Sequence, residues 1–119
     1  MTTPNIIQVQ TINGNSNVAN VTTSATAIVT NSVGSNKIFK INGIMVTNTS
    51  GSSNATLTLD FYRSSNAYLM ASNVVITSGT TYTPVDKTLS LYLLEGDALR
   101  LTANVSSTLQ AVATWEEIS

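Results

Sequence analysis

Apolar and polar residues alternate along the chain in short runs, which is the pattern of β-strands that bury one face. The clearest run spans residues 55–62, and the runs at 98–105 and 109–116 alternate in the same way. Weaker runs predict further strands at 6–11, 26–31, 68–76, 80–84 and 88–93. Clusters of Gly, Asn and Ser separate these runs. The chain is therefore predicted to be all-β, a single antiparallel β-sandwich of about eight strands, jelly-roll-like.

The inward faces of these strands define the expected core. Its predicted members are Phe39, Ile41, Leu57, Leu59, Phe61, Leu69, Leu91, Leu93, Leu99, Leu101, Leu109 and Trp115. The alternation in residues 37–48 changes phase halfway, so all its apolar residues face the core only if one extra residue is inserted. This predicts a β-bulge at Asn42-Gly43 with Gly43 in a left-handed conformation. The alternative is a strand buried on both faces, which needs no bulge.

Polar segments between strong strands predict the turns. The loop at 48–54 is expected to join two paired strands as a hairpin, and residues 63–66 to form a shorter connection of the same kind. Gly96, between Glu95 and Asp97, is expected to supply the positive φ of a tight turn.

Residues 11–36 contain no charged and no aromatic side chain, and their alternation is weak. Two interpretations stay open: loosely specified strands, or an extended arm that becomes ordered against a neighbouring subunit. The chain is therefore divided into an N-terminal polar segment, residues 1–36, and a β-sandwich body, residues 37–119. The uncharged segment is the expected contact with other subunits, and its deletion is expected to abolish binding while leaving the body folded.

The composition excludes most enzyme chemistry. The chain has no His and no Cys, so it has no Ser-His-Asp or Cys-His nucleophile, no thiolate or imidazole zinc site and no disulfide. The scattered basic residues and the net charge of −1 argue against nucleic-acid binding. Neither a membrane span nor a signal peptide is expected.

Thr, Ser and Asn make up 47 of the 119 residues, whereas charged residues account for only 9%. The abundance of β-branched residues argues against disorder and favours strands. A surface of hydroxyls and amides can be buried in an assembly without the cost of desolvating ions. The composition therefore suits a protein that works inside a larger assembly, and equally a sequence that evolved under weak selection for charge; composition alone leaves both interpretations open.

The carboxylates are the available acid, base or metal-binding groups. Glu95 and Asp97 flank a turn and could contribute to a calcium site, but no loop motif supplies the other oxygens, so a plain turn is favoured. Asp60 and Asp86 could act as a glycosidase pair only if folding brought them to the right separation. Residues 116–117, two glutamates, are expected to point to opposite faces of a strand end as solubilising charges. No catalytic, metal or cofactor site is assigned.

The aromatic residues could form a sugar-stacking platform, although core and rim positions of a small sandwich explain them better. They are Tyr62, Tyr68, Tyr82, Tyr92 and Trp115. Four Asn-x-Ser/Thr triplets, which begin at Asn20, Asn48, Asn54 and Asn104, are as many as this composition produces by chance. They carry no information on glycosylation.

Short motifs follow one another in a definite order along residues 37–119. They are Lys40-Ile41, Ile44-Met45-Val46-Thr47-Asn48, Ala55-Thr56-Leu57-Thr58-Leu59-Asp60-Phe61-Tyr62, Tyr68-Leu69, Asp86-Lys87, Leu91-Tyr92-Leu93-Leu94-Glu95-Gly96-Asp97-Ala98-Leu99-Arg100 and Trp115-Glu116-Glu117-Ile118-Ser119. In this order and spacing they resemble a group of small virion structural proteins of tailed bacteriophages. The resemblance does not cover residues 1–36.

The resemblance implies a non-enzymatic β-sandwich protein of the phage particle, a capsid decoration or cement protein on the outer capsid surface. The implied partners are the major capsid protein and further copies of the chain in a homotrimer, with no nucleic acid, membrane or cofactor. Two alternatives stay open: a neck, tail or baseplate component, and a host-glycan-binding module of the particle.

Overall fold

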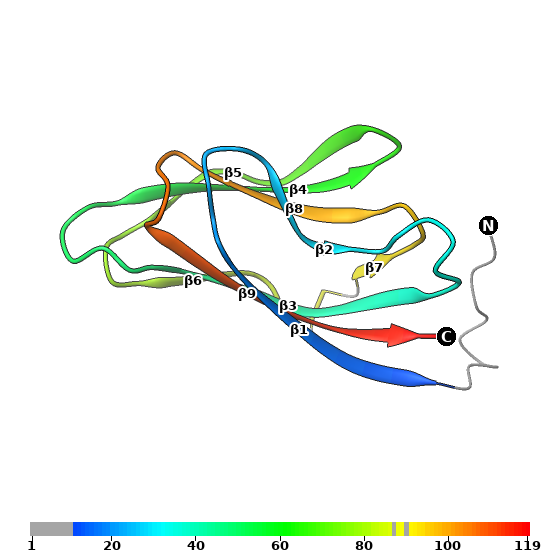
Figure 1. The fold of residues 1–119 in the computed structure, drawn as a ribbon. Helices are drawn as coiled ribbons and strands as arrows, with labels where there is room; N and C mark the ends of the chain where they lie inside the picture. The colour runs from blue at the N-terminus through cyan, green and yellow to red at the C-terminus, as the bar shows by residue number, and fades with distance from the viewer. Residues whose placement is uncertain (1–10, 87, 90) are drawn as a thin grey trace.

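The computed structural model describes residues 11–86, 88–89 and 91–119 (Figure 1). These residues form the strands β1 (Ile12–Asn20), β2 (Thr26–Thr30), β3 (Ile38–Asn48), β4 (Ala55–Arg63), β5 (Asn66–Ile76), β6 (Thr81–Val85), β7 (Leu91–Leu93), β8 (Ala98–Ala103) and β9 (Leu109–Ile118). Within those ranges there is no helix with the length and apolar character needed to cross a membrane.

The strands form two antiparallel sheets that pack face to face. The five-stranded sheet has the order β1-β9-β3-β6, with β7 also paired to β3, and the four-stranded sheet has the order β2-β8-β4-β5. Apart from β7, each early strand pairs with a late one: β1 with β9, β2 with β8, β3 with β6 and β4 with β5. This nested pairing is the jelly-roll topology, so the predicted fold class is confirmed.

The core lies between the two sheets and is built mainly from the predicted residues. Those that are buried are Phe39, Ile41, Leu57, Leu59, Leu93, Leu99, Leu101 and Leu109. Phe61, Leu91 and Trp115 are partly buried and pack against them. Alternation at period two therefore identified the inner faces of both sheets.

Leu69 is the error in the predicted core, because 62% of its surface is exposed. Leu59 lies opposite Ala71 while the next residue, Asp60, lies opposite Leu69, so Met70 is an extra residue in β5. An extra residue reverses the alternation on one side of it. Ala71 consequently faces the core, and Leu69 lies on the outer face beside Asp60.

The predicted β-bulge in β3 is confirmed. The register against β9 shifts between Ile41 and Gly43, which lets Ile41 and Ile44 both face the core, with 1% and 0% of their surface exposed. The predicted left-handed conformation of Gly43 is wrong, because its φ is not positive. The commonest bulges need no left-handed residue, since their first residue stays near the right-handed helical region.

Two of the predicted turns are confirmed. The β4–β5 hairpin turns at Ser64 and Ser65, whose φ angles of 54° and 62° fit the type I′ turn, and Gly96 has a φ of 88°. The predicted hairpin at 48–54 is wrong, because β3 and β4 belong to different sheets. A polar loop of this length suits either a hairpin or a crossing between layers, and only the pairing partners of the strands distinguish them.

Two strands lie within residues 11–36, the segment for which two interpretations were open. β1 pairs with β9 along its whole length, β2 pairs with β8, and Val21, Ile28 and Val29 are buried in the core. Because two strands of the sandwich come from this segment, the body is not expected to fold without it. The predicted strand at 6–11 lies, apart from Thr11, outside the described residues.

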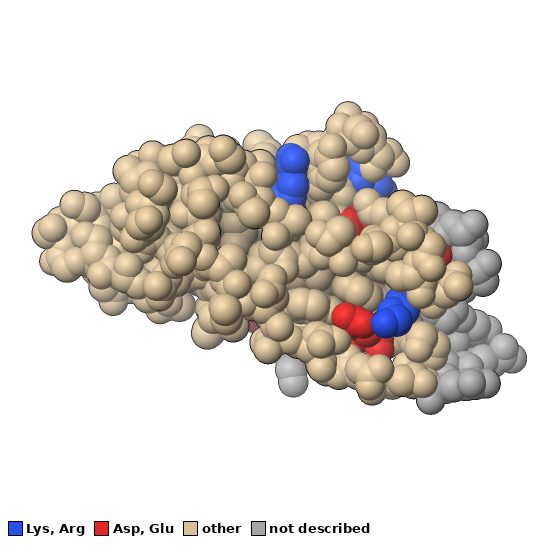
Figure 2. Space-filling view, in the orientation of Figure 1, with Lys and Arg blue, Asp and Glu red and all other residues tan. Residues whose placement is uncertain are grey.

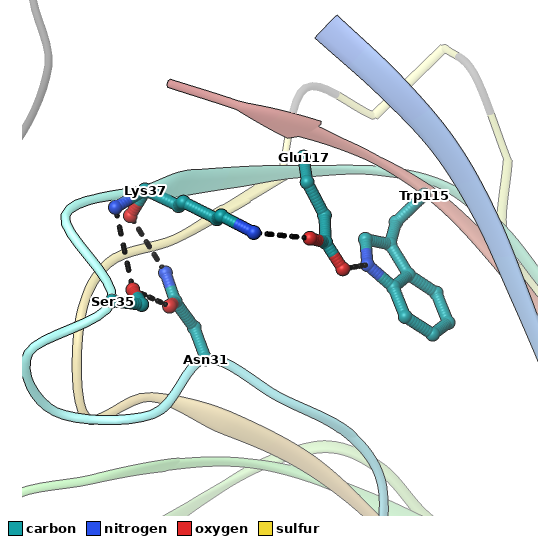
Figure 3. Close-up of polar contacts among 5 residues, drawn as sticks. All are labelled: Asn31, Ser35, Lys37, Trp115 and Glu117. Carbon is teal, nitrogen blue, oxygen red and sulfur yellow. Dashed lines mark hydrogen bonds and ion pairs between the residues drawn. The ribbon is translucent and has the colours of Figure 1, made fainter. Parts of the chain in front are cut away.

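A buried asparagine holds the crossing from β2 to β3. The Asn31 side chain is fully buried, and its Nδ2 donates to the carbonyl oxygens of Lys37 and Leu93, both at 2.9 Å. Its Oδ1 accepts a hydrogen bond from the Ser35 hydroxyl (Figure 3). The amide thus supplies the donors and the acceptor that a strand partner would supply elsewhere.

A second buried asparagine does the same at the crossing from β3 to β4. Nδ2 of Asn48 donates to the carbonyl oxygens of Ser53 and Ile76, both at 2.9 Å, and its Oδ1 accepts from the Ser50 amide at 2.9 Å. No part of Asn48 is exposed, so the triplet that begins there is not accessible for glycosylation in the folded chain.

Candidate interaction surfaces

The two carboxylates that flank Gly96 fix loops. Asp97, which is 2% exposed, accepts hydrogen bonds from Arg63 Nε at 2.8 Å, from Arg63 Nη2 and from the Leu94 amide. The hydrogen bond to Asp97 raises the pKa of Arg63 above its ordinary value. Glu95 accepts from the Gly34 amide at 2.6 Å. Throughout the described ranges, no group of three or more acidic residues forms a metal site.

The fold places Asp60 and Asp86 on elements of different sheets. Asp60 lies on the outer face of the four-stranded sheet, but neighbouring side chains leave only 3% of it exposed. Its Oδ1 is 2.9 Å from Nε of Arg100, and the Arg100 guanidinium lies 4.0 Å from the Tyr62 ring centroid. Asp86 follows β6 in the other sheet. The hydroxyl and amide of Thr88 donate to Asp86 and lower the pKa of this exposed carboxyl.

The two C-terminal glutamates lie on opposite faces of β9, as predicted. Glu116 accepts from Nδ2 of Asn42 at 3.3 Å. Glu117 lies 3.0 Å from Nζ of Lys37 and accepts a hydrogen bond from Nε1 of Trp115 at 3.3 Å (Figure 3). Glu117 therefore ties the start of β3 to β9 as well as adding charge.

The aromatic residues do not share one face. Tyr62 lies on the outer face of the four-stranded sheet, and Tyr92 lies beside Lys40 on the outer face of the other sheet. Tyr82 and Trp115 pack against the core, where Trp115 stacks on Phe39 with 6.0 Å between ring centroids. Tyr68 is exposed on β5, opposite Phe61. Such a distribution is typical of core and rim positions, and it does not gather these five residues on one face.

Charged side chains gather toward the end of the sandwich where β1 begins and β9 ends (Figure 2). The left-hand part of that view, over the loops that join β3 to β4 and β5 to β6, shows no charged side chain. The loops at this opposite end, residues 49–54, 77–80 and 104–108, consist mainly of Ser, Thr, Asn and Gly and carry no charge. These three loops are called the uncharged end.

Hydrogen bonds connect the loops of the uncharged end to one another. The Thr49 hydroxyl donates to the Thr108 carbonyl oxygen at 3.0 Å, and the Ser78 amide donates to Oδ1 of Asn54 at 3.2 Å. These bonds join loops that are distant in sequence. The uncharged end is thus a preorganised surface of hydroxyls and amides, which can form hydrogen bonds to a partner without stripping water from ions.

A row of apolar residues crosses the outer face of the five-stranded sheet. Val18, Val112 and Met45 lie side by side on β1, β9 and β3, with Val18 and Met45 exposed. Two hollows of about 330 and 280 Å³ meet at Val112. The sequence did not single out this row, because two of its three residues lie in strands whose alternation is weak or shifted in phase.

No protein-family model matches the chain, and no curated protein matches it. Among solved structures the chain is similar to a protein of Bacillus endospore appendages, which form disulfide-linked pili, with a TM-score of 0.52 and 9% sequence identity. The match covers 99% of this chain and 95% of that one. At this identity the likeness shows a shared fold alone, and this chain has no cysteine with which to form disulfide links.

Proposed function

We propose that the protein is a non-enzymatic structural subunit of a bacteriophage particle, a decoration protein on the outer surface of the capsid. The observation that carries the proposal is the uncharged end, a rigid surface of hydroxyls and amides at one end of a sandwich whose charges gather at the other. The order of motifs over residues 37–119, which resembles that of small phage virion proteins, supports a phage particle as the assembly.

Decoration has a simple physical basis. A protein that bridges several capsid subunits binds fully only when those subunits hold their mature spacing, so its binding stabilises the mature shell by mass action. The proposed partners are the major capsid protein and further copies of the chain, with a homotrimer matching points where three capsid units meet. No catalytic step, cofactor, nucleic acid or membrane takes part in this function.

A neck, tail or baseplate subunit is the second candidate. It is favoured by the structural likeness to a pilus protein, because that likeness covers 99% of this chain and the same sandwich can form an adaptor or a fibre. A host-glycan-binding module is less well supported, since Tyr62, Tyr92 and Trp115 lie on three different faces.

Placing charge on the uncharged end is expected to weaken binding to the particle by more than about tenfold, because each new lysine must be desolvated at the contact. The variant is Ser52→Lys with Ser106→Lys, two exposed loop serines whose side chains make no hydrogen bond among the described residues. Binding is measured by co-sedimentation with particles that lack the protein.

The matched control is Ser32→Lys, which adds a lysine to an exposed loop at the charged end. This variant is expected to sediment with particles as the unaltered protein does. Undiminished binding of the Ser52→Lys, Ser106→Lys variant would contradict a role of the uncharged end.

A further inference from the structure

The open edges of the two sheets differ in how well they are protected against pairing with another chain. An edge strand presents a row of backbone donors and acceptors, and proteins usually block it with charge, proline, bulges or short length. The edges of this sandwich are β1 on one side of the five-stranded sheet, β6 and β7 on its other side, and β2 and β5 in the four-stranded sheet.

All edges except β1 carry such a device. β5 shifts register twice against β4 and has a left-handed residue at Asn73. β6 contains Pro84 and a register shift, and β7 has three residues. β2 has five residues with a shift at Ile28, whose carbonyl oxygen accepts a hydrogen bond from the Asn17 side chain.

β1 has none of these devices within the described part of the chain. It has nine residues, no proline and no charge, and its register against β9 runs without a shift from Ile12 to Asn20. All but one of its residues are exposed, including Val18 with 70% of its surface in solvent. A long, regular and uncharged edge of this kind is a template for a further strand.

The hydrogen bonds at the ends of β1 show which backbone groups face outward. Thr11 and Ser119 exchange both backbone hydrogen bonds, and the Val21 amide donates to Leu109. In an antiparallel ladder such pairs recur at every second residue, so the odd-numbered residues of β1 bond to β9. The N–H and C=O groups of the even-numbered residues, with Ser16 at the centre, point away from the sheet toward the open edge.

We infer that β1 pairs with β1 of a second copy of this chain, antiparallel and related by a two-fold axis at Ser16. A two-fold contact must be complementary to itself, and this strand is. Gly14 of one copy lies opposite Val18 of the other, so a small residue faces a large one, and Ser16 lies opposite Ser16. No charge opposes a like charge, and the two five-stranded sheets become one continuous sheet.

The inference goes beyond the proposed function, because it holds whatever particle the protein binds. A two-fold contact does not by itself make a trimer. It joins two single copies, or two trimers, and in both cases it doubles the molar mass.

The first test is the molar mass of the full-length chain by light scattering after size exclusion. Ser16→Lys places two lysines directly opposite each other across the axis, where like charges oppose pairing. Its molar mass is expected to be half that of the unaltered chain. Ser72→Lys, which adds the same charge to an exposed position of β5, is expected to leave the mass unchanged.

The second test locates the axis and does not depend on how well the lysine variant folds. The chain has no cysteine, so Ser16→Cys introduces its single thiol, and paired Cα atoms about 5.5 Å apart permit a disulfide. Under a mild oxidant the Ser16→Cys variant is expected to form covalent dimers at least about ten times faster than the Ser72→Cys variant. Equal masses for Ser16→Lys and the unaltered chain, or equal cross-linking rates for the two cysteine variants, would overturn the inference.

Discussion

Replacing Asn48 by aspartate is expected to lower the free energy of unfolding at neutral pH by about 3–5 kcal/mol, the usual cost of a buried charge without a partner. Both donors of the Asn48 amide point at carbonyl oxygens, those of Ser53 and Ile76. A carboxylate would bring negative charge against these two acceptors, in a site from which water is excluded. Denaturant unfolding followed by circular dichroism measures the change.

The substitution changes charge and hydrogen bonding but hardly changes shape, so it isolates the role of the amide. Asn31→Asp is expected to have a loss of similar size, because Nδ2 of Asn31 also donates to two carbonyl oxygens. Asn20→Asp, at an exposed position of β1, is the control and is expected to change stability little.

The loss of unfolding free energy in Asn48→Asp should shrink as the pH falls, because a protonated carboxyl can donate one hydrogen bond. A loss equal to that of the Asn20 control would contradict this account.

Deleting residues 1–30 is expected to abolish cooperative unfolding. The deletion removes β1 and β2 together with Val21, Ile28 and Val29, which are at most 3% exposed. Burial of such a side chain contributes about 1.5–3 kcal/mol, and the two strands also contribute their hydrogen bonds to β9 and β8. That sum is comparable with the whole stability of a typical domain, about 5–15 kcal/mol.

The matched control for this deletion is a chain that begins at Thr11 and therefore keeps every described strand. It is expected to unfold in one cooperative transition, whereas the chain that begins at Asn31 is expected to show none. Thermal unfolding followed by circular dichroism compares the two. A sharp transition in the shorter chain would mean that residues 31–119 fold alone and that the segment is an arm after all.

The fold was predictable where strands bury one full face. β4, β8 and β9 alternate regularly, because each packs one side on the core and turns the other outward. β1 stayed open between a strand and an arm because it lies at an edge and is exposed at eight of its nine positions, so burial imposes almost no pattern on it. The nested pairing of early with late strands is a property of long-range contacts, which alternation does not encode.

The surface features were predictable only in part. An uncharged surface follows from the composition, but that the charges gather at one end depends on which loops the fold brings together. Asn31 and Asn48 could not be distinguished from the other asparagines, since the chain contains 13 and the amide itself is the same in each. Leu69 was misplaced because the bulge at Met70 has no glycine or proline to mark it in the sequence.

The proposed function is that of a decoration subunit on a bacteriophage capsid. The most direct test is the number of copies per purified particle, measured by quantitative mass spectrometry against the major capsid protein. A decoration subunit is expected in a copy number equal to that of the major capsid protein or to a simple fraction of it. A handful of copies per particle would contradict the claim and would assign the protein to the neck, tail or fibres.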